Sequence, residues 1–300
     1  MHKITGDLAI KRIPDDVEDA RKAPEGLPAI AKDNQQLFGY FVAGIGCGKT
    51  TFLLRLLEKY LKTHSFDYVF WCSPTSTRDK KVRSVLGKAP AGVQIVYDTD
   101  FPLTEIEQLI DEKLEEYDLT LKYIPVYWKY LRLYKSVKYD SEEEEILELF
   151  SDDELELLNH FKFEPPTKFP NGKPTFAIVV DDFLGDKHVF STHMNSQFNR
   201  FITTMRHRRT SVFVSVQSWT QTIPPSLRSM VNIFALWRCA NPKIKKAMAE
   251  TMCGHYLTPD KFLELWDTAT KDDIHDAFVG ILQSPEGERF RKNLNESLGG

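Results

Sequence analysis

Short apolar runs alternate with longer segments of helical period along most of the chain. The first run, 37–43, ends in a glycine-rich stretch, after which apolar residues recur at the three- and four-residue spacing of one helix face. The residues with this spacing are Phe52, Leu53, Leu56, Leu57, Tyr60 and Leu61. This order predicts a buried strand, a tight loop and an amphipathic helix.

Further apolar runs predict the rest of a sheet. They lie at 66–72, 93–97, 176–180, 212–216, 233–237 and 277–282. These runs are short and rich in β-branched and aromatic residues, which is typical of central parallel strands. Because helical segments separate many of them, the pattern predicts an α/β fold with a mainly parallel central sheet flanked by helices.

Two parts of the chain depart from this alternation. Residues 1–36 mix charges with prolines and keep no period, so we expect an N-terminal arm there. Residues 101–163 turn helical, with capping boxes expected at Thr104/Glu107 and Ser151/Glu154. The second part is predicted to be a helical insertion in a domain that spans 37–300.

The composition excludes several classes of protein. The chain has 300 residues, 42% hydrophobic and 27% charged, which is ordinary globular usage. Its four cysteines form no CxxC pair, so neither a disulfide framework nor a zinc ribbon is indicated, and the eight histidines show no metal-ligand spacing. No apolar run is long enough to span a membrane, and the first residues lack the apolar core of a secretory signal. We therefore expect a soluble, intracellular protein.

Charge is distributed unevenly along the chain. Residues 187–249 contain ten Lys and Arg and no Asp or Glu, whereas 140–156 contain ten acids and no base. The basic block fits contact with phosphate or DNA, and it fits equally well charge that is neutralised within the fold or solvated. A second basic segment, 122–139, interleaves Lys and Arg with aromatic residues. This mixture suits nucleic acid binding, but its spacing also fits an amphipathic helix.

The strongest chemical signal is the segment Ala43–Thr50, which matches the P-loop pattern with alanine in place of the first glycine. Its glycines let backbone N–H groups point at an anion, and the following helix adds its positive N-terminal end. Lys49 would bind the β- and γ-phosphates, and the Thr50 hydroxyl would coordinate Mg²⁺. The predicted nucleotide-binding residues are Gly44, Ile45, Gly46, Cys47, Gly48, Lys49, Thr50 and Thr51.

A second signal is the apolar strand 176–180, which ends in Asp181 and Asp182 and matches the Walker B pattern. Asp181 would hold the Mg²⁺ shell, and Asp182 would orient or polarise the attacking water. Together the two motifs predict a P-loop ATPase domain that uses ATP and Mg²⁺.

Polar residues around the strand at 212–216 complete the candidate site. Gln217, at its carboxyl end, is the candidate sensor of the γ-phosphate. Arg206, Arg208 and Arg209 precede this strand, and one of them is a candidate arginine finger for an adjacent subunit. A structural or DNA-facing role fits each arginine as well.

The combined motifs resemble the FtsK/HerA superfamily, and within it the genome-packaging ATPases of large nucleocytoplasmic DNA viruses, virophages and polinton-like elements. The resemblance covers about residues 36–290. Its motifs are the P-loop, Ser73-Pro74-Thr75, Asp181-Asp182, Arg206-His207, Gln217, Pro224-Pro225, Arg228 and Asn232.

The resemblance implies a homo-oligomeric ring, pentameric or hexameric, that hydrolyses ATP to move double-stranded DNA into a preformed capsid. It implies a capsid or capsid-vertex protein as partner, and a location in the host cytoplasm, the virus factory or the virion. It also supports Lys49 and Thr50 for the nucleotide and Mg²⁺, Asp181 and Asp182 for metal and water, and Gln217 as sensor.

Three departures and several alternatives stay open. Ala43 replaces the more common glycine, Asp182 stands where many relatives have glutamate, and the insertion matches no family motif. A HerA-like DNA helicase or repair translocase would share every motif. A nucleotide-gated assembly protein would bind ATP, and its rate of ATP turnover would not change when DNA is added. A metabolic P-loop kinase fits least, because no acceptor-substrate lid is recognisable.

Overall fold

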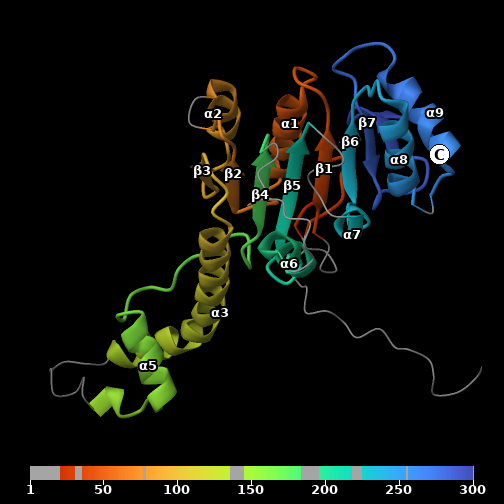
Figure 1. The fold of residues 1–300 in the computed structure, drawn as a ribbon. Helices are drawn as coiled ribbons and strands as arrows, with labels where there is room; N and C mark the ends of the chain where they lie inside the picture. The colour runs from red at the N-terminus through yellow and green to blue at the C-terminus, as the bar shows by residue number, and fades with distance from the viewer. Residues whose placement is uncertain are drawn as a thin grey trace, which may run out of the picture.

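The described residues of the computed structural model form one nine-stranded sheet (Figure 1), and they comprise 21–30, 36–76, 79–135, 145–183, 196–217, 225–254 and 256–299. Six strands are parallel, in the order β3 (Gln94–Asp98), β2 (Tyr68–Cys72), β4 (Phe176–Asp181), β5 (Thr210–Val216), β1 (Phe38–Val42) and β6 (Ile233–Leu236). Antiparallel strands β7 (Phe278–Ile281), β8 (Phe290–Lys292) and β9 (Glu296–Ser297) extend the sheet beyond β6. The predicted α/β class and mainly parallel sheet are confirmed.

Helices cover both faces of this sheet. In β5, Val212 and Val214 pack into the core on one face, and Phe213 packs into the core on the other, as the two-residue period of a strand requires. Helices α1 (Lys49–Lys62) and α2 (Lys80–Leu86) lie on the Phe213 face. The opposite face carries α6 (Gln197–Thr204), α7 (Pro225–Arg228), α8 (Pro242–Met252), α9 (Pro259–Thr270) and the start of α3 (Leu103–Tyr134). No described helix is long and apolar enough to cross a membrane.

Most described residues of 101–163 are helical, and the part beyond the first turns of α3 has an apolar cluster of its own and forms a lobe. Only the first turns of α3 pack on the sheet; the helix then leads away from it to α5 (Asp152–His160) (Figure 1). There a separate apolar cluster joins Tyr123, Val126, Tyr127 and Tyr130 of α3 to Phe150 and Leu158. Three of the aromatic residues in the 122–139 segment are therefore packing residues of an amphipathic helix, while Trp128 remains 56% exposed.

One of the two expected capping boxes is confirmed and the other is wrong. At the start of α5, Ser151 Oγ accepts from Glu154 N at 3.3 Å, and Ser151 N donates to Glu154 Oε2 at 2.9 Å. Helix α3 instead begins at Leu103, one residue before Thr104, without a side-chain cap. Thr104 and Glu107 both accept hydrogen bonds from Gln197 Nε2 of α6, at 2.9 and 2.8 Å. This tertiary contact takes the groups that a local cap would have used.

The N-terminal segment 21–30 packs against the domain. Arg21 pairs with Asp67 at 2.6 Å and donates to the Lys173 carbonyl, while Leu27 and Ile30 are buried beside α1. Of the expected arm at 1–36, the other described residue is Gln36; residues 1–20 and 31–35 lie outside the described residues.

Leu158→Ala is expected to loosen the α3–α5 lobe by about 2–5 kcal/mol, because it leaves a cavity at a fully buried position. Amide hydrogen exchange along Tyr123–Tyr130 would report this as faster exchange. Leu149→Ala, at a 60% exposed position, is the matched control and should change little. Equal exchange in both variants would contradict the packing described.

Candidate nucleotide-binding site

The strand order places three motifs at one edge of the sheet. Because β1, β5 and β4 are adjacent and parallel, their carboxyl ends meet, with Val42 opposite Val216 and Asp181 opposite Ser215. The P-loop follows β1, Gln217 follows β5, and Asp182 follows β4. The P-loop thus becomes a neighbour of Asp181, although Thr50 and Asp181 are 131 residues apart in the sequence.

The loop between β1 and α1 has an anion-binding conformation. Gly46 and Gly48 have φ of 80° and 95°, values at which a side chain is strained. Gly48 is the N-cap of α1, which begins at Lys49 with no side-chain cap and no acidic residue in its first turn. The first N–H groups of α1 are thus left for an external anion, and the helix dipole adds positive potential.

Lys49 is folded back into the loop. Its ammonium donates to the carbonyl oxygens of Ala43 at 3.1 Å and Gly44 at 3.3 Å, and the residue is only 8% exposed. The positive charge is therefore held within the loop, where phosphate oxygens would replace the carbonyls as its partners.

Thr50 and Asp181 connect the two motifs directly. Thr50 Oγ1 donates to Asp181 Oδ2 at 3.0 Å. The other carboxylate oxygen, Asp181 Oδ1, is buried and has no hydrogen-bond partner among the described residues. Burial raises the pKa of the Asp181 carboxyl, and the neighbouring hydroxyls of Ser215 and Thr50 offset this in part. An unsatisfied carboxylate oxygen next to a hydroxyl is a donor set that fits a hard divalent cation.

Asp182 and Gln217 also meet. Asp182 is exposed, its N–H donates to Ser215 O at 3.1 Å, and its φ of 63° lies in the left-handed region that non-glycine residues seldom adopt. Gln217 Nε2 donates to Asp182 Oδ1 at 2.6 Å. The Asp182 carboxylate is thus positioned by a strained backbone and held by the side chain of Gln217, the residue that follows β5. Strained backbone of this kind is common at functional sites.

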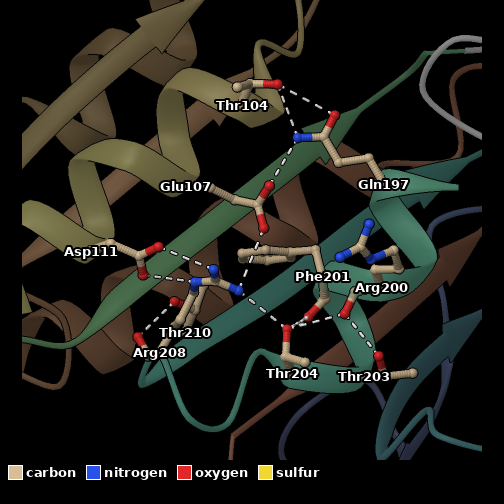
Figure 2. A network of polar contacts seen from close by, with 10 residues as sticks. All are labelled: Thr104, Glu107, Asp111, Gln197, Arg200, Phe201, Thr203, Thr204, Arg208 and Thr210. Atoms are coloured by element: carbon tan, nitrogen blue, oxygen red, sulfur yellow. Dashed lines mark hydrogen bonds and ion pairs between the residues drawn. The ribbon is translucent and has the colours of Figure 1, made fainter.

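The three candidate finger arginines lie at the opposite edge of the sheet. They precede β5, whose seven residues separate them from the Gln217 edge by about 20 Å. Arg208 binds both oxygens of Asp111, at 2.8 and 3.0 Å, and pairs with Glu107 at 3.4 Å (Figure 2). Arg209 is buried and donates to the Pro174 carbonyl. The structure does not bring these residues to the P-loop of their own chain.

Arg206 differs from its two neighbours. It is exposed, its Nε contacts His207 Nε2 at 3.4 Å, and it makes no ion pair with any described residue. Of the three candidates, it therefore has the side chain most available to another molecule.

Much of the basic block is neutralised within the fold. Arg208 pairs with α3, Lys245 pairs with Asp267 of α9, and Arg238 caps the C-terminal carbonyls of α9 at Thr270 and Lys271. Over the described ranges, no ion pair joins this block to the acidic block at 140–156. The acids that pair with this block come instead from α3, α8 and α9.

Sequence reasoning missed a set of residues beside the P-loop. A cavity of about 810 Å³ lies between Gly46 and Gly48 on one side and Lys81, His275 and the turn 293–295 on the other. No motif marks these residues, because only the packing of α2 and of the C-terminal strands brings them to the loop.

No protein-family model and no curated protein matches the sequence. Among solved structures, the chain is similar to the genome packaging NTPase B204 of Sulfolobus turreted icosahedral virus 2 bound to AMP. The two sequences are 8% identical, the match covers 86% of this chain and 96% of that chain, and the TM-score is 0.47. The DNA-packaging ATPase B204 of Sulfolobus turreted icosahedral virus gives 8% identity, 87% and 98% coverage, and a TM-score of 0.48.

A third similar structure is the cytoplasmic domain of the type VII secretion ATPase EccC of Thermomonospora curvata. It gives 15% identity, 83% coverage of this chain and 24% of that chain, and a TM-score of 0.37. At these identities the similarity concerns the fold alone.

Gln217→Ala is expected to lower the turnover number for ATP by about 10²-fold or more and to leave the KM within about twofold, because the side chain positions Asp182 and not the substrate. Steady-state phosphate release over a range of ATP concentrations would measure both. Gln197→Ala, at an exposed glutamine of α6 that contacts α3, is the matched control. Unchanged turnover in Gln217→Ala would rule out this positioning role.

Proposed function

We propose that this protein hydrolyses ATP to drive double-stranded DNA into a preformed capsid, acting as a homo-oligomeric ring. The observation that carries the ATPase part is the hydrogen bond from Thr50 to Asp181, which joins the P-loop to the Walker B strand. The DNA part is supported by the resemblance of the sequence motifs to genome-packaging ATPases.

In this proposal, the P-loop binds the phosphates of ATP. The N–H groups of residues 44–51 donate to phosphate oxygens, and Lys49 exchanges its loop carbonyls for the β- and γ-phosphates. The Thr50 hydroxyl and the Asp181 carboxylate would hold Mg²⁺, which when bound neutralises charge on the β- and γ-phosphate oxygens. The unpartnered Asp181 Oδ1 is the observation that favours a cation here.

Asp182 orients the water that attacks the γ-phosphorus. Its carboxylate accepts a hydrogen bond from that water, while Gln217 holds the same carboxylate in place through Oδ1. The bond to the ADP oxygen breaks as the bond to water forms, which releases ADP and phosphate. The aspartate is one methylene shorter than the glutamate of many relatives, and it lies on a backbone with φ 63°.

The remaining charge compensation is proposed to come from a second subunit. A guanidinium supplied in trans can stabilise the transferring phosphoryl group. Arg206, Arg208 and Arg209 lie too far from the P-loop of their own chain to act there. Arg206 is the best placed of the three to reach a neighbour, since it is exposed and the other two are held inside the fold.

DNA contact is proposed to use the exposed part of the basic block. Arg200, Arg206, Lys243 and Lys246 are exposed, although Lys246 pairs with Glu250 one helical turn away at 4.0 Å. Arg208, Arg209, Arg238 and Lys245 are held by partners from other parts of the chain. The number of DNA phosphates contacted per subunit is thus smaller than the ten charges of the block suggest. A capsid or capsid-vertex protein completes the proposed assembly.

Lys49→Ala should abolish ATP hydrolysis, because it removes the ammonium held inside the loop. Asp182→Asn should still bind ATP, while its turnover number falls by about 10²-fold or more. Phosphate release and nucleotide titration would separate the two effects. Lys62→Ala, an exposed lysine in the last turn of α1, is the control. Near-normal hydrolysis by Lys49→Ala would exclude the P-loop assignment.

Double-stranded DNA should raise ATP turnover, and binding should weaken steeply with salt as phosphate contacts release counterions. Arg200→Ala and Arg206→Ala should each reduce the salt slope of DNA binding by about one. ATP-dependent oligomerisation with turnover indifferent to DNA would favour an assembly protein instead, and strand separation would favour a helicase.

A further inference from the structure

The α3–α5 lobe stands away from the sheet, at the far end of α3 (Figure 1). Tyr123, Tyr127 and Tyr130 of α3 share its apolar cluster with Leu158 of α5, which is fully buried. Lys129 pairs with Glu154 at 2.7 Å between the same two helices. The helices are thus fixed against each other, and each also has an outer side that is turned away from its partner.

The outer side of α3 is apolar and basic. Each of its residues is two positions from a residue of the lobe's cluster, which is about 200° around a helix. They recur every three or four positions, as one helix face requires, and all are exposed: Leu121, Pro125, Trp128, Arg132 and Lys135.

Two features of this side indicate a contact surface. Leu121 is 50% exposed and Trp128 is 56% exposed, so a large apolar area lies open on one helix face. Arg132 donates only to the Trp128 carbonyl of its own helix, at 3.3 Å, and neither Arg132 nor Lys135 makes an ion pair with a described residue. Both cations are therefore available to acids of another molecule.

The outer side of α5 is acidic. Glu156 is two positions and Asp153 five positions from Leu158, so both lie on the side of α5 that is turned away from α3. Asp152, and Glu148 before the helix, are also exposed. Among the described residues none of these four acids has an ion-pair partner, whereas Glu154 on the inner side is paired.

The two outer sides cannot meet within one lobe. Because α3 and α5 pack through their inner sides, the outer sides point in opposite directions. One side carries cations and the other carries acids, so they are complementary surfaces on opposite sides of one molecule. Such surfaces match between copies in a head-to-tail contact, and contacts of this kind close into a ring when the rotation from copy to copy allows it.

We propose that the outer side of α3 in one copy of this chain binds the outer side of α5 in the next copy. Arg132 and Lys135 then face Asp153 and Glu156 of the neighbour, and the neighbour covers Trp128. A second copy accounts for the acidic side as well as the basic side, whereas DNA would match the cations alone. The contact gives the helical lobe a role in assembly, and it rests on the proposed function only in requiring that the chain self-associate.

Charge reversal on each side, measured by sedimentation velocity of the full-length chain over a range of concentrations with MgATP, tests the contact. The α3 variant is Arg132→Glu with Lys135→Glu, and the α5 variant is Asp153→Lys with Glu156→Lys. Each alone should need about a tenfold higher concentration to self-associate, because like charges then face each other between copies. Circular dichroism would check that both variants keep their helices.

Two rescues should distinguish this contact from a general effect of charge. An equimolar mixture of the two variants should associate where neither does alone, because each reversed side then meets an opposite charge on the other chain. A chain that carries all four substitutions should assemble like the wild type. Lys88→Glu with Lys168→Glu, at exposed positions outside both sides, changes the net charge as the α3 variant does and is the matched control.

Wild-type self-association in both double variants would overturn the inference and leave the proposed ring intact, since the ATPase domains would then assemble without the lobe. Loss of association without rescue in the mixture would also overturn it. Weaker DNA binding by the α3 variant, with unchanged self-association, would assign this side of α3 to DNA instead. A wild-type chain that stays monomeric with MgATP at every concentration would overturn the ring of the proposed function together with this contact.

Discussion

The parallel pairing of β1 with β5 and of β5 with β4 is the constraint on which the candidate site depends. It aligns the carboxyl ends of three strands that are far apart in the sequence, so that Lys49, Asp182 and Gln217 share one edge. Two hydrogen bonds then join these elements, from Thr50 to Asp181 and from Gln217 to Asp182. A one-residue slip of β5 would move Gln217 away from Asp182 and would turn Phe213 to the face on which Val212 and Val214 now pack.

The charged groups divide into two sets with different roles. At the P-loop edge, Lys49 and Asp181 are buried, and their desolvation is offset in part by the carbonyls of Ala43 and Gly44 and by the Thr50 hydroxyl. At the opposite edge, Arg208 joins α6 to α3 through Asp111 and Glu107, and the same interface includes Gln197 (Figure 2). This polar contact holds the start of α3, from which the helical lobe extends, against α6 and the turn before β5.

The sequence predicted the parts of the structure that local patterns determine. The strands at 37–43 and 176–180, the glycine-rich loop and the Ser151 cap all follow from short-range rules, and the structure has them. Features that depend on tertiary packing could not be predicted in this way. Thr104 fits the sequence pattern of a helix cap, but in the structure its hydroxyl binds Gln197 instead. Strands β8 and β9 are too short to give a period in the sequence. Nothing near Lys81 or His275 in the sequence shows that the fold places them beside Gly48.

The most direct test of the account is a triplex-displacement assay with the purified chain. A third DNA strand bound to a linear duplex is removed when a motor moves along the duplex. The account predicts ATP-dependent displacement of the third strand, with the duplex left paired and no displacement by the Asp182→Asn variant. ATP hydrolysis without displacement, or separation of the duplex strands, would contradict the central claim that this site drives movement along double-stranded DNA.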